Sequence, residues 1–320
     1  MKLTALYSFL SKDLEIVENE LLSTVQSNDP LIRDAGTHLF RAGGKRIRPV
    51  FVLLSSMFGH YDIDHIKHVA VALELIHSAS LVHDDVVDDA ELRRGELTIK
   101  SKWDNRIAMY VGDYLFARSL EIITKMENPL IHQVLSKTLI EVCLGEIEQI
   151  RDKYNYQQSY RTYVKRIKRK TALLIAASCQ LGALAAGAPE YIFKRLFLYG
   201  YNVGLSYQII DDILDFTSTE EQLGKPVGSD LLQGNITLPV LFSMENPDLR
   251  KKIMSINSET TSEEIKPIIE EIRASGAIER SVEISNRYLQ KSFDILEDLP
   301  RGKARTALHQ IAKYIGKRKF

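Results

Sequence analysis

The stretch that decides the fold of this chain is LIHSASLVHDDVVDD, residues 75–89, an apolar segment that ends in a run of carboxylates. A second apolar segment, residues 207–215, reads YQIIDDILD and ends in the same way. On a helix, residues four apart share a face, so each DDxxD would project its first and fifth residues together. The repeated DDxxD pattern therefore predicts two apolar helices that each end in a carboxylate pair.

The two predicted pairs, Asp84 with Asp88 and Asp211 with Asp215, would repel internally unless a cation compensates them. Carboxylates near a helix C-terminus also oppose the helix dipole. Oxygen ligands suit Mg²⁺, which commonly takes one or two carboxylates and completes its shell with water and substrate phosphate. A single cluster would be explained equally well as a solvated helix end, but two copies favour magnesium sites that bind a diphosphate.

Helical periodicity runs through the whole chain, and alternating strand patterns are scarce, so the sequence predicts an all-α protein. A capping box at residues 261–264 begins a further helix. No low-complexity linker divides the chain, and we expect a single domain over residues 1–320. The expected helices, with more in the last sixty residues, cover 3–26, 31–41, 48–58, 64–89, 105–126, 129–152, 159–186, 190–216, 235–244 and 248–255.

Composition and charge exclude several classes of protein. Lysine plus arginine total 42, as do aspartate plus glutamate, so no net charge favours nucleic acid. Leucines at helical spacing make residues 3–21 an amphipathic helix rather than a signal peptide. The uncharged stretch 171–189 is rich in small residues, which predicts a buried helix rather than a membrane span. Cys143 and Cys179 form no metal motif, so we expect a reduced, cytoplasmic protein.

Basic residues that could neutralise a diphosphate occur at several places. In GGKRIRP, residues 43–49, the glycines permit close backbone approach, and Lys45 and Arg48 lie at a predicted helix start. Arg93 and Arg94 follow the first aspartate cluster, where guanidinium groups could hold phosphate oxygens. Each signal alone is weak, because a basic loop is usually just solvated.

Further candidates lie on the predicted helices and on one later loop. His77 lies two helical turns before the first cluster, on the same face, although a lone histidine is more often a core residue. Lys170 and Thr171 lie where a charged segment gives way to an apolar helix. Lys225, in a glycine-rich segment, could fold over bound phosphate. The charges upstream of Lys170 are expected to form a solvated face without chemistry: Lys165, Arg166, Lys168 and Arg169.

Taken in order, these motifs resemble the trans-isoprenyl diphosphate synthases: GGKRIRP, LIHSASLVHDDVVDDAELRRG, GD at 112–113, KT at 170–171, YQIIDDILD and LGKPVGSDL. The resemblance covers about residues 35–240, and the joint pattern is highly specific. It implies the isoprenoid synthase fold, with antiparallel helices around a central apolar cavity and the two aspartate motifs facing each other across its mouth.

The resemblance also implies roles for individual side chains. The principal magnesium ligands would be Asp84, Asp88 and Asp211, with further or supporting ligands at Asp85, Asp212 and Asp215. Isopentenyl diphosphate would bind Lys45, Arg48, His77 and Arg94. The allylic diphosphate would bind Arg93, Lys170, Thr171, Gln208 and Lys225, of which Lys170 and Gln208 would act in catalysis with the aspartates. Many relatives have a lysine where this chain has Asn235, so a phosphate contact there is in doubt.

The implied reaction is repeated condensation of isopentenyl diphosphate onto an allylic diphosphate, for which we expect farnesyl diphosphate. Breaking the allylic C–O bond leaves negative charge on the diphosphate, which about three Mg²⁺ ions and the basic side chains would stabilise. The double bond of the second substrate attacks the carbocation, and the released diphosphate takes the proton. Gln208 and Thr171 would help to stabilise the cation in a dry cavity.

Within the family the chain is most similar to the large catalytic subunits of two-component heptaprenyl diphosphate synthases, a match that the C-terminal AKYIGKRKF strengthens. This implies a heptaprenyl product for a menaquinone side chain and a smaller, non-identical partner subunit. A homodimer through the same helices is the alternative, and membrane contact would be at most peripheral, for product release.

Product length should depend on the helix that precedes Asp84. Ala79 and Ser80, five and four residues upstream, are small, whereas an aromatic ring one turn (about 5.4 Å) below the carboxylates would stop chain growth early. Their smallness favours a long product, although small residues also allow close helix packing.

Other functions stay open at this point. One is a synthase of different product length, from hexaprenyl to decaprenyl, and another is a non-catalytic subunit of the same fold, which should lack one of the motifs. A terpene cyclase or squalene-synthase-like enzyme would not need the GGKRIRP set. A diphosphate hydrolase would need a positioned water and would form no carbon–carbon bond.

Overall fold

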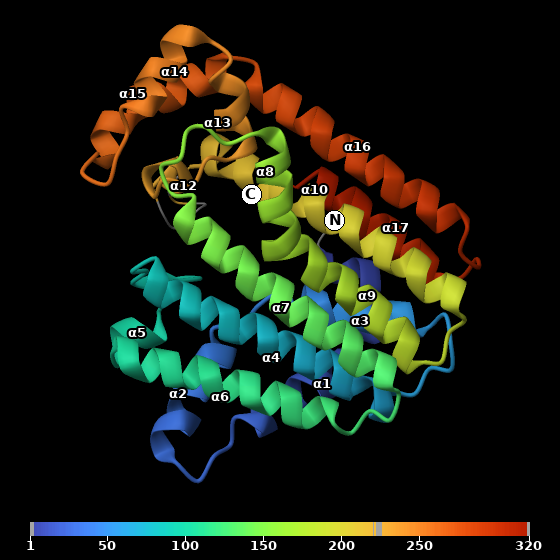
Figure 1. Ribbon diagram of the computed structural model, residues 1–320. Helices are drawn as coiled ribbons and strands as arrows, with labels where there is room; N and C mark the ends of the chain where they lie inside the picture. Colours follow the sequence, from blue (N-terminus) through green and yellow to red (C-terminus); the bar gives the residue numbers. More distant parts are fainter. Residues whose placement is uncertain (1–2, 220, 222–225, 319–320) are drawn as a thin grey trace. The chain divides into compact units, whose positions relative to one another are not determined.

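The computed structural model describes residues 3–219, 221 and 226–318, which are helical almost throughout, as the sequence predicted (Figure 1). The chain divides into two compact units. Unit 1 takes its residues from 1–136, 177–197 and 300–308, and unit 2 from 137–176, 198–299 and 309–320. The single domain expected over 1–320 stays a prediction.

Unit 1 is built around α4. Its elements are η1 (Leu3–Leu10, a 3-10 helix), α1 (Ser11–Thr24), α2 (Pro30–Arg41), α3 (Ile47–Ser56), α4 (Ile63–Val87), β1 (Leu92–Arg93), β2 (Glu96–Leu97), α5 (Ile99–Lys102) and α6 (Asn105–Ile123). Helix α4 is apolar on most of its circumference and packs against α1, α3, α5 and α6. At Gly112 of α6 an added Cβ would collide with the imidazole of His83, so the glycine lets α6 approach α4 closely.

Unit 2 contains most of the second half of the chain. Its elements are α8 (Tyr160–Ile167), η2 (Lys168–Ala172, a π-helix), α12 (Ser229–Leu232), α13 (Leu238–Ser243), α14 (Pro247–Met254), α15 (Ser262–Ala274) and α16 (Ala277–Glu297). The predicted capping box is confirmed, because the Thr261 hydroxyl accepts from the Glu264 amide while the Glu264 carboxylate accepts from the Thr261 amide.

Four helices contribute residues to both units: α7 (Pro129–Arg151), α9 (Leu173–Ala185), α10 (Glu190–Thr217) and α17 (Lys303–Gly316). Most of the uncharged segment 171–189 forms α9, whose side chains are mostly buried, as expected from the sequence. No helix among the described residues combines the length and apolar character needed to cross a bilayer.

The structure differs from the predicted elements in several details. The single helix expected over 159–186 contains the π-helical turn η2, and the helix expected from residue 3 begins as a 3-10 helix with a non-helical Tyr7. The sequence also missed α5, α12 and the hairpin of β1 with β2, because each is too short to show a periodic pattern.

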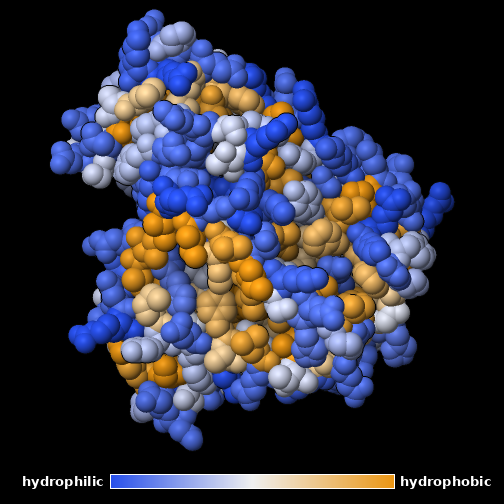
Figure 2. Space-filling model, in the orientation of Figure 1, coloured by the Kyte–Doolittle hydropathy of each residue, from blue (hydrophilic) through white to orange (hydrophobic). Residues whose placement is uncertain are grey.

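The part of α7 that belongs to unit 2 exposes an apolar stripe. Ile140, Leu144 and Ile147 are 59%, 40% and 60% exposed, and their spacing places them on one helix face. Figure 2 shows hydrophobic side chains along the face of α7 that is visible in that view. We call these three residues the α7 stripe.

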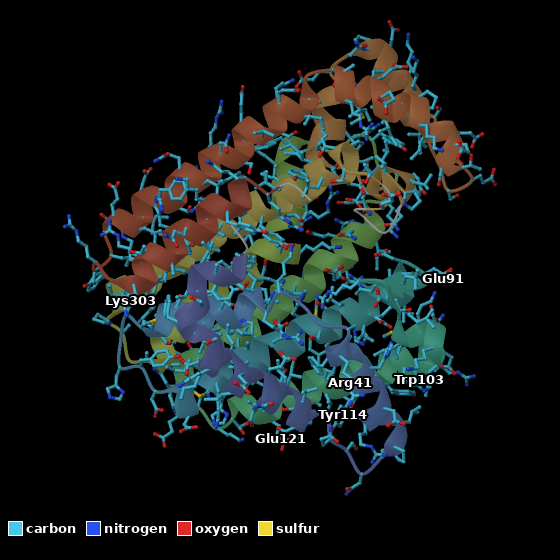
Figure 3. The ribbon with its side chains drawn as sticks, turned by 180° about the vertical axis from the view of Figure 1, so that it is seen from behind. Arg41, Glu91, Trp103, Tyr114, Glu121 and Lys303 are labelled. Atoms are coloured by element: carbon cyan, nitrogen blue, oxygen red, sulfur yellow. The ribbon has the colours of Figure 1, made fainter. Side chains whose placement is uncertain are left out.

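Unit 1 has a polar surface pocket of about 550 Å³ beside α2 and α5. Arg41 and Trp103, both labelled in Figure 3, belong to its lining. The ring of His38 meets the edge of Trp103 at 5.8 Å between centroids, and the Lys102 ammonium lies 5.0 Å from the Trp103 ring. None of the predicted site residues lines this pocket.

Candidate active site

The first aspartate motif lies at the C-terminal end of α4, in unit 1. Asp84 and Asp88 are one turn apart and half-buried, and the Asp88 amide donates to the Asp84 carbonyl at 2.8 Å. Asp85 is buried at 4% exposure and accepts a hydrogen bond from Arg93 Nε at 2.7 Å. Burial raises the pKa of Asp85, and Arg93 opposes that rise. The motif thus presents a carboxylate pair and keeps its middle aspartate for an internal ion pair.

A tight hairpin places the two arginines that follow this motif. Arg93 pairs with Glu96 across the two short strands, and Arg94 and Gly95 form the turn with φ of +57° and +82°. Positive φ at both central residues is typical of the type I′ turn, which matches the twist of a hairpin. Arg93 therefore reaches back to α4, while the Arg94 guanidinium donates to the carbonyl of Gly43.

The loop that contains Lys45 lies beneath Arg94. An added Cβ on Gly44 would lie 2.7 Å from Arg94 Nη1 and 2.9 Å from Arg46 Nη1, so a larger residue would require these guanidinium groups to shift. Arg48 follows in the first turn of α3 and is 9% exposed. The GGKRIRP segment therefore lies in contact with Arg94 of the predicted arginine pair.

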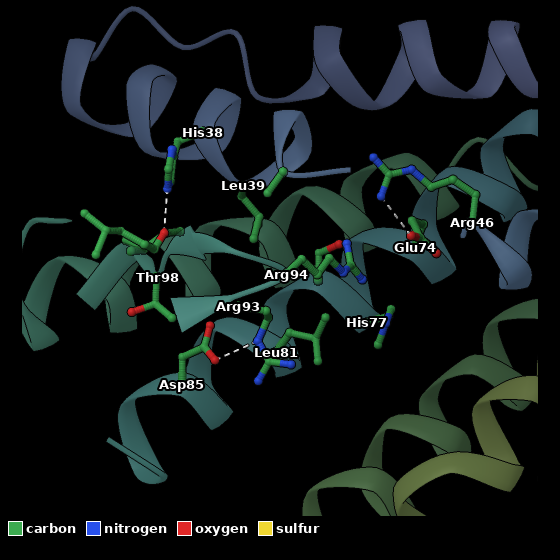
Figure 4. A pocket seen from close by; sticks show the side chains of 14 residues that line it. His38, Leu39, Arg46, Glu74, His77, Leu81, Asp85, Arg93, Arg94 and Thr98 are labelled. Carbon is green, nitrogen blue, oxygen red and sulfur yellow. Dashed lines mark hydrogen bonds and ion pairs between the residues drawn. The ribbon is translucent and has the colours of Figure 1, made fainter. Parts of the chain in front are cut away.

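Arg46, Arg93 and Arg94 line a small pocket with a volume of about 30 Å³, shown in Figure 4. Seven of the lining residues have ionisable side chains: His38, Arg46, Glu74, His77, Asp85, Arg93 and Arg94. Desolvation and the surrounding guanidinium groups, led by that of Arg48, hold the pKa of His77 well below its ordinary value. At neutral pH, His77 is therefore an uncharged imidazole within a strongly basic pocket.

The second aspartate motif lies near the C-terminal end of α10, in unit 2. Asp212 is 3% exposed and accepts two hydrogen bonds, from Tyr163 Oη at 2.7 Å and from Gln208 Nε2 at 2.9 Å. The Thr171 hydroxyl donates to Gln208 Oε1 at 2.5 Å. Burial raises the pKa of Asp212 to about 7. Four side chains thus form one continuous hydrogen-bonded row, from Thr171 through Gln208 and Asp212 to Tyr163.

The other two aspartates of this motif have different partners. Asp211 is 32% exposed at its side chain and accepts from the guanidinium of Arg318, near the C-terminus. Asp215 is 2% exposed, and its carboxylate accepts from the Ser229 hydroxyl at 3.0 Å and from the Asp230 amide at 3.1 Å. Asp215 therefore fixes the start of α12, and Asp211 is the most accessible carboxylate of the motif.

The π-helical turn η2 positions Lys170 and Thr171. An added Cβ on Gly204 of α10 would lie 2.6 Å from Ala172 Cα, so this glycine allows α10 to pass close to the turn. Lys170 Nζ donates to Gln149 Oε1 at 2.9 Å. The turn thus places both predicted residues between the C-terminal end of α8 and the N-terminal end of α9.

The expectation of a solvated charged face before Lys170 is wrong for two residues. Arg166 is 7% exposed and donates to Gln158 Oε1 at 2.8 Å and to the carbonyl of Ile236. Arg169 is 13% exposed at its side chain and pairs with carboxylates of α7. Both guanidinium groups bind protein acceptors. That they do not bind phosphate stays a prediction, for which the physical reason is now these internal contacts and not exposure to solvent.

The donor sets fit the metal that the sequence predicted. Within 3–219, 221 and 226–318, no three His, Cys, Asp or Glu side chains gather closely enough to hold an ion by themselves. Mg²⁺ commonly takes only one or two carboxylates and completes its shell with water and phosphate oxygens. The partly exposed carboxylates of Asp84, Asp88 and Asp211 match this requirement. Asp85, Asp212 and Asp215 are buried and accept hydrogen bonds from protein donors.

Some predicted features stay untested by the structure. Lys225 lies outside the described residues. The Asn235 amide donates to the Asp230 carbonyl at 2.8 Å, which places the residue just beyond α12. Whether the Asn235 side chain contacts a phosphate is not tested by this backbone contact. The meeting of the two aspartate motifs across one cavity stays a prediction, because they belong to different units.

Sequence reasoning missed three side chains at these sites: Arg46, Tyr163 and Arg318. The signal for Arg46 was present, since it lies within GGKRIRP, and AKYIGKRKF includes Arg318. Tyr163 had no such signal, because its contact with Asp212 spans 49 positions of the chain.

Comparisons with known proteins point to one family. The model of the family described as Polyprenyl synthetase matches residues 29–272. The chain is 66% identical over 320 residues to Heptaprenyl diphosphate synthase component 2 of Bacillus subtilis (strain 168), an alignment that covers 100% of this chain and 92% of that protein.

Two crystal structures have similar folds. Heptaprenyl diphosphate synthase from Staphylococcus aureus has a TM-score of 0.93 at 43% identity, over 97% of this chain and 98% of that chain. The polyprenyl synthase from Caulobacter crescentus CB15, complexed with calcium and isoprenyl diphosphate, has a TM-score of 0.94 at 31% identity, over 99% and 98% of the two chains.

Proposed function

The chain belongs to the polyprenyl synthetase family, and we propose that it is a magnesium-dependent trans-prenyltransferase that adds isopentenyl diphosphate repeatedly to an allylic diphosphate. The observation that carries this proposal is the pair of half-buried carboxylates Asp84 and Asp88 beside the basic pocket around His77. A non-catalytic subunit would have no need to retain both aspartate motifs and these basic sets.

The basic residues in and around the pocket of unit 1 are assigned to the diphosphate of isopentenyl diphosphate. Lys45, Arg48 and Arg94 would neutralise its phosphates, and Gly44 gives the substrate a loop without a side chain to approach. His77, uncharged because its pKa is low, would contribute a hydrogen bond rather than a further positive charge. Arg93, already paired with Asp85, would act on the allylic diphosphate from the edge of the same hairpin.

The row in unit 2 is assigned to the allylic substrate. Because the Thr171 hydroxyl donates its hydrogen bond to Gln208, the lone pairs of the Thr171 oxygen can face a positive centre. Gln208 is in turn oriented by Asp212, which Tyr163 holds. These oxygens would stabilise the allylic carbocation, while Lys170 would neutralise the departing diphosphate.

Asp84, Asp88 and Asp211 would hold the Mg²⁺ ions, about three in number when substrate is bound. When bound, Mg²⁺ supplies the positive charge that stabilises the leaving diphosphate. Asp85, Asp212 and Asp215 would support the site through their bonds to Arg93, Gln208 and Ser229.

The product is proposed to be heptaprenyl diphosphate, formed from farnesyl diphosphate for a menaquinone side chain. The relative from Bacillus subtilis bears that product in its name and aligns with the whole of this chain. Ala79 is fully buried in α4 and Ser80 is half-buried. Both side chains are small, so no aromatic ring lies at these positions below the carboxylates. A cytoplasmic location is part of the same proposal.

A smaller, different subunit is proposed as the partner. The name of the Bacillus subtilis relative designates it as component 2, which implies another component of that enzyme. The α7 stripe is an exposed apolar face of suitable chemistry for such a contact. Replacing Ile140 and Ile147 with glutamate should abolish co-purification of the partner without unfolding the chain.

The proposed function is tested by product analysis. The purified chain, alone and with the candidate small subunit, would be incubated with Mg²⁺, farnesyl diphosphate and labelled isopentenyl diphosphate, and the products sized after dephosphorylation. We expect a heptaprenyl product that requires the partner for full rate. Release of phosphate without elongation would contradict the proposal and favour a hydrolase, and long products at full rate from the chain alone would remove the partner requirement.

A further inference from the structure

We propose that Arg46, Glu18 and Glu74 form a positioning cluster that holds the 43–48 loop in place for isopentenyl diphosphate; the inference rests on the proposed function. Arg46 Nε and Nη2 donate to the two carboxylate oxygens of Glu18 at 2.6 and 2.7 Å. Arg46 Nη1 donates to Glu74 at 3.3 Å, and Nη2 also approaches the Phe40 carbonyl at 3.3 Å. The guanidinium is therefore occupied by protein acceptors on all of its nitrogens.

Burial distinguishes this cluster from a surface ion pair. The side chains of Arg46 and Glu74 are 14% and 4% exposed, whereas Glu18 is 36% exposed. Glu74 Oε2 is buried and accepts no hydrogen bond from the residues that the structure describes, so the charge of Glu74 depends on Arg46 for compensation. Arg46 is thus a structural cation inside a segment whose other cations are assigned to substrate.

The cluster connects three parts of unit 1 that are distant in sequence. Glu18 lies on α1, Arg46 lies at the start of α3, and Glu74 lies on α4, one turn before His77. Arg46 caps α3 with a left-handed φ of +47°, a conformation that a non-glycine residue keeps only when its surroundings hold it. The contacts with Glu18 and Glu74 supply that constraint.

The consequence for substrate binding follows from chain connectivity. Lys45 directly precedes Arg46 and Arg48 follows two residues later, so a change in the backbone at Arg46 moves both assigned phosphate ligands. The Arg46 guanidinium also forms one wall of the gap at Gly44, with Arg94 as the other. The cluster therefore acts on isopentenyl diphosphate through Lys45, Arg48 and Arg94.

The test compares Arg46→Met, Arg46→Lys and Glu18→Gln with the control Arg41→Gln, a nearby exposed arginine. For Arg46→Met we expect the KM for isopentenyl diphosphate to rise about tenfold, with kcat and the KM for farnesyl diphosphate changed less than about twofold. Arg46→Lys keeps the charge but loses the fork, and should give an intermediate value. Arg41→Gln should resemble the wild type.

Glu18→Gln separates positioning from direct binding. A positioning role requires Glu18→Gln to raise the same KM, and the double variant Glu18→Gln/Arg46→Met to be no worse than Arg46→Met alone. If Glu18→Gln leaves that KM unchanged while Arg46→Met raises it, Arg46 binds phosphate directly and the cluster is refuted. Equal changes in the KM of both substrates would also refute it.

Two measurements keep this result separate from the proposed function. Titration calorimetry with isopentenyl diphosphate reports binding without turnover, and circular dichroism melting shows whether each variant folds. If Arg46→Met does not fold, Glu18→Gln decides the test. The Glu18 side chain is partly exposed, so its replacement should not unfold the chain. If the wild type forms no prenyl product, the proposed function fails, whereas unchanged calorimetric affinity in folded variants refutes the cluster alone.

Discussion

The guanidinium of Arg318 donates a hydrogen bond to the carboxylate of Asp211 and lies 5.1 Å from the ring centroid of Tyr207. The Arg318 side chain is 10% exposed, so the contact is more than a passing surface ion pair. Asp211 is the most accessible carboxylate of the second motif and a proposed Mg²⁺ ligand. A cation of the protein itself therefore compensates the charge of Asp211 in this structure, and Mg²⁺ would compete with it.

Arg318→Gln should lower the Mg²⁺ concentration that gives half-maximal activity by about threefold, as expected for loss of a partly exposed ion pair. The variant removes the competing cation and keeps a polar side chain. Mg²⁺ titration of the initial rate measures the effect, with Lys317→Gln, a change at the exposed neighbouring residue, as the control. An unchanged or higher Mg²⁺ requirement would show that Arg318 does not compete for Asp211.

Removing a proposed metal ligand should be far more damaging than removing the adjacent surface aspartate. We expect Asp84→Asn, Asp88→Asn and Asp211→Asn each to lower kcat at least about 100-fold, because the leaving diphosphate loses charge stabilisation. Asp89→Asn is the matched control, since Asp89 is exposed and paired only with Lys100 in the contacts of the described chain. Steady-state rates at saturating Mg²⁺ decide the matter, and a mild effect at Asp84 would remove it from the metal site.

The buried Asp212 should make stability depend on pH. Burial raises its pKa in the folded protein to about 7 from an ordinary 3.8, so the folded chain keeps a proton that the unfolded chain releases between these values. Stability is therefore lost as pH rises from about 4 to 7. Asp212→Asn cannot ionise, so its Tm should fall less steeply than that of the wild type between pH 4 and pH 7.

Melting curves at several pH values in a chelating buffer measure this difference without bound metal. Asp248→Asn, at an exposed helix start, should leave the wild-type pH dependence unchanged. Parallel curves for the wild type and Asp212→Asn would mean that Asp212 titrates normally.

Ala79→Phe should shorten the product, because the ring would lie in the wall of α4 about one turn below Asp84. Ala79 is fully buried, so overpacking should also cost about 1–3 kcal/mol of stability. Ser80→Phe lies at a half-buried position and should be tolerated better, and Ala79→Val should shorten the product less. Reversed-phase chromatography of the dephosphorylated products gives the lengths. A heptaprenyl product from a folded Ala79→Phe enzyme would show that this wall does not limit growth.

The helices that carry the site could be predicted because their patterns are local. Helices α4 and α10 are long, and the apolar runs before Asp84 and Asp211 specify helix type and the spacing of the carboxylates. The all-α class followed from the same signal, and the similar solved structures confirm it.

What the sequence missed depends on contacts between distant residues. Whether Arg46 binds a phosphate or a carboxylate depends on Glu18, 28 positions earlier, and the fate of Arg318 depends on Asp211, 107 positions earlier. The middle aspartates Asp85 and Asp212 looked equivalent to their neighbours, yet burial gives them protein donors instead of an open face. The π-helical turn at Thr171 inserts too little length to disturb a periodic pattern.

We propose that Asp84, Asp88 and Asp211 bind Mg²⁺ ions that share one diphosphate. A crystal structure of the protein with Mg²⁺ and a non-ionisable thiolodiphosphate analogue of farnesyl diphosphate tests it most directly. We expect oxygen ligands from all three aspartates on ions that contact the same diphosphate, with Thr171 and Gln208 beside C1 of the farnesyl group. A diphosphate held by only one motif, with the other open to solvent and free of metal, would contradict it.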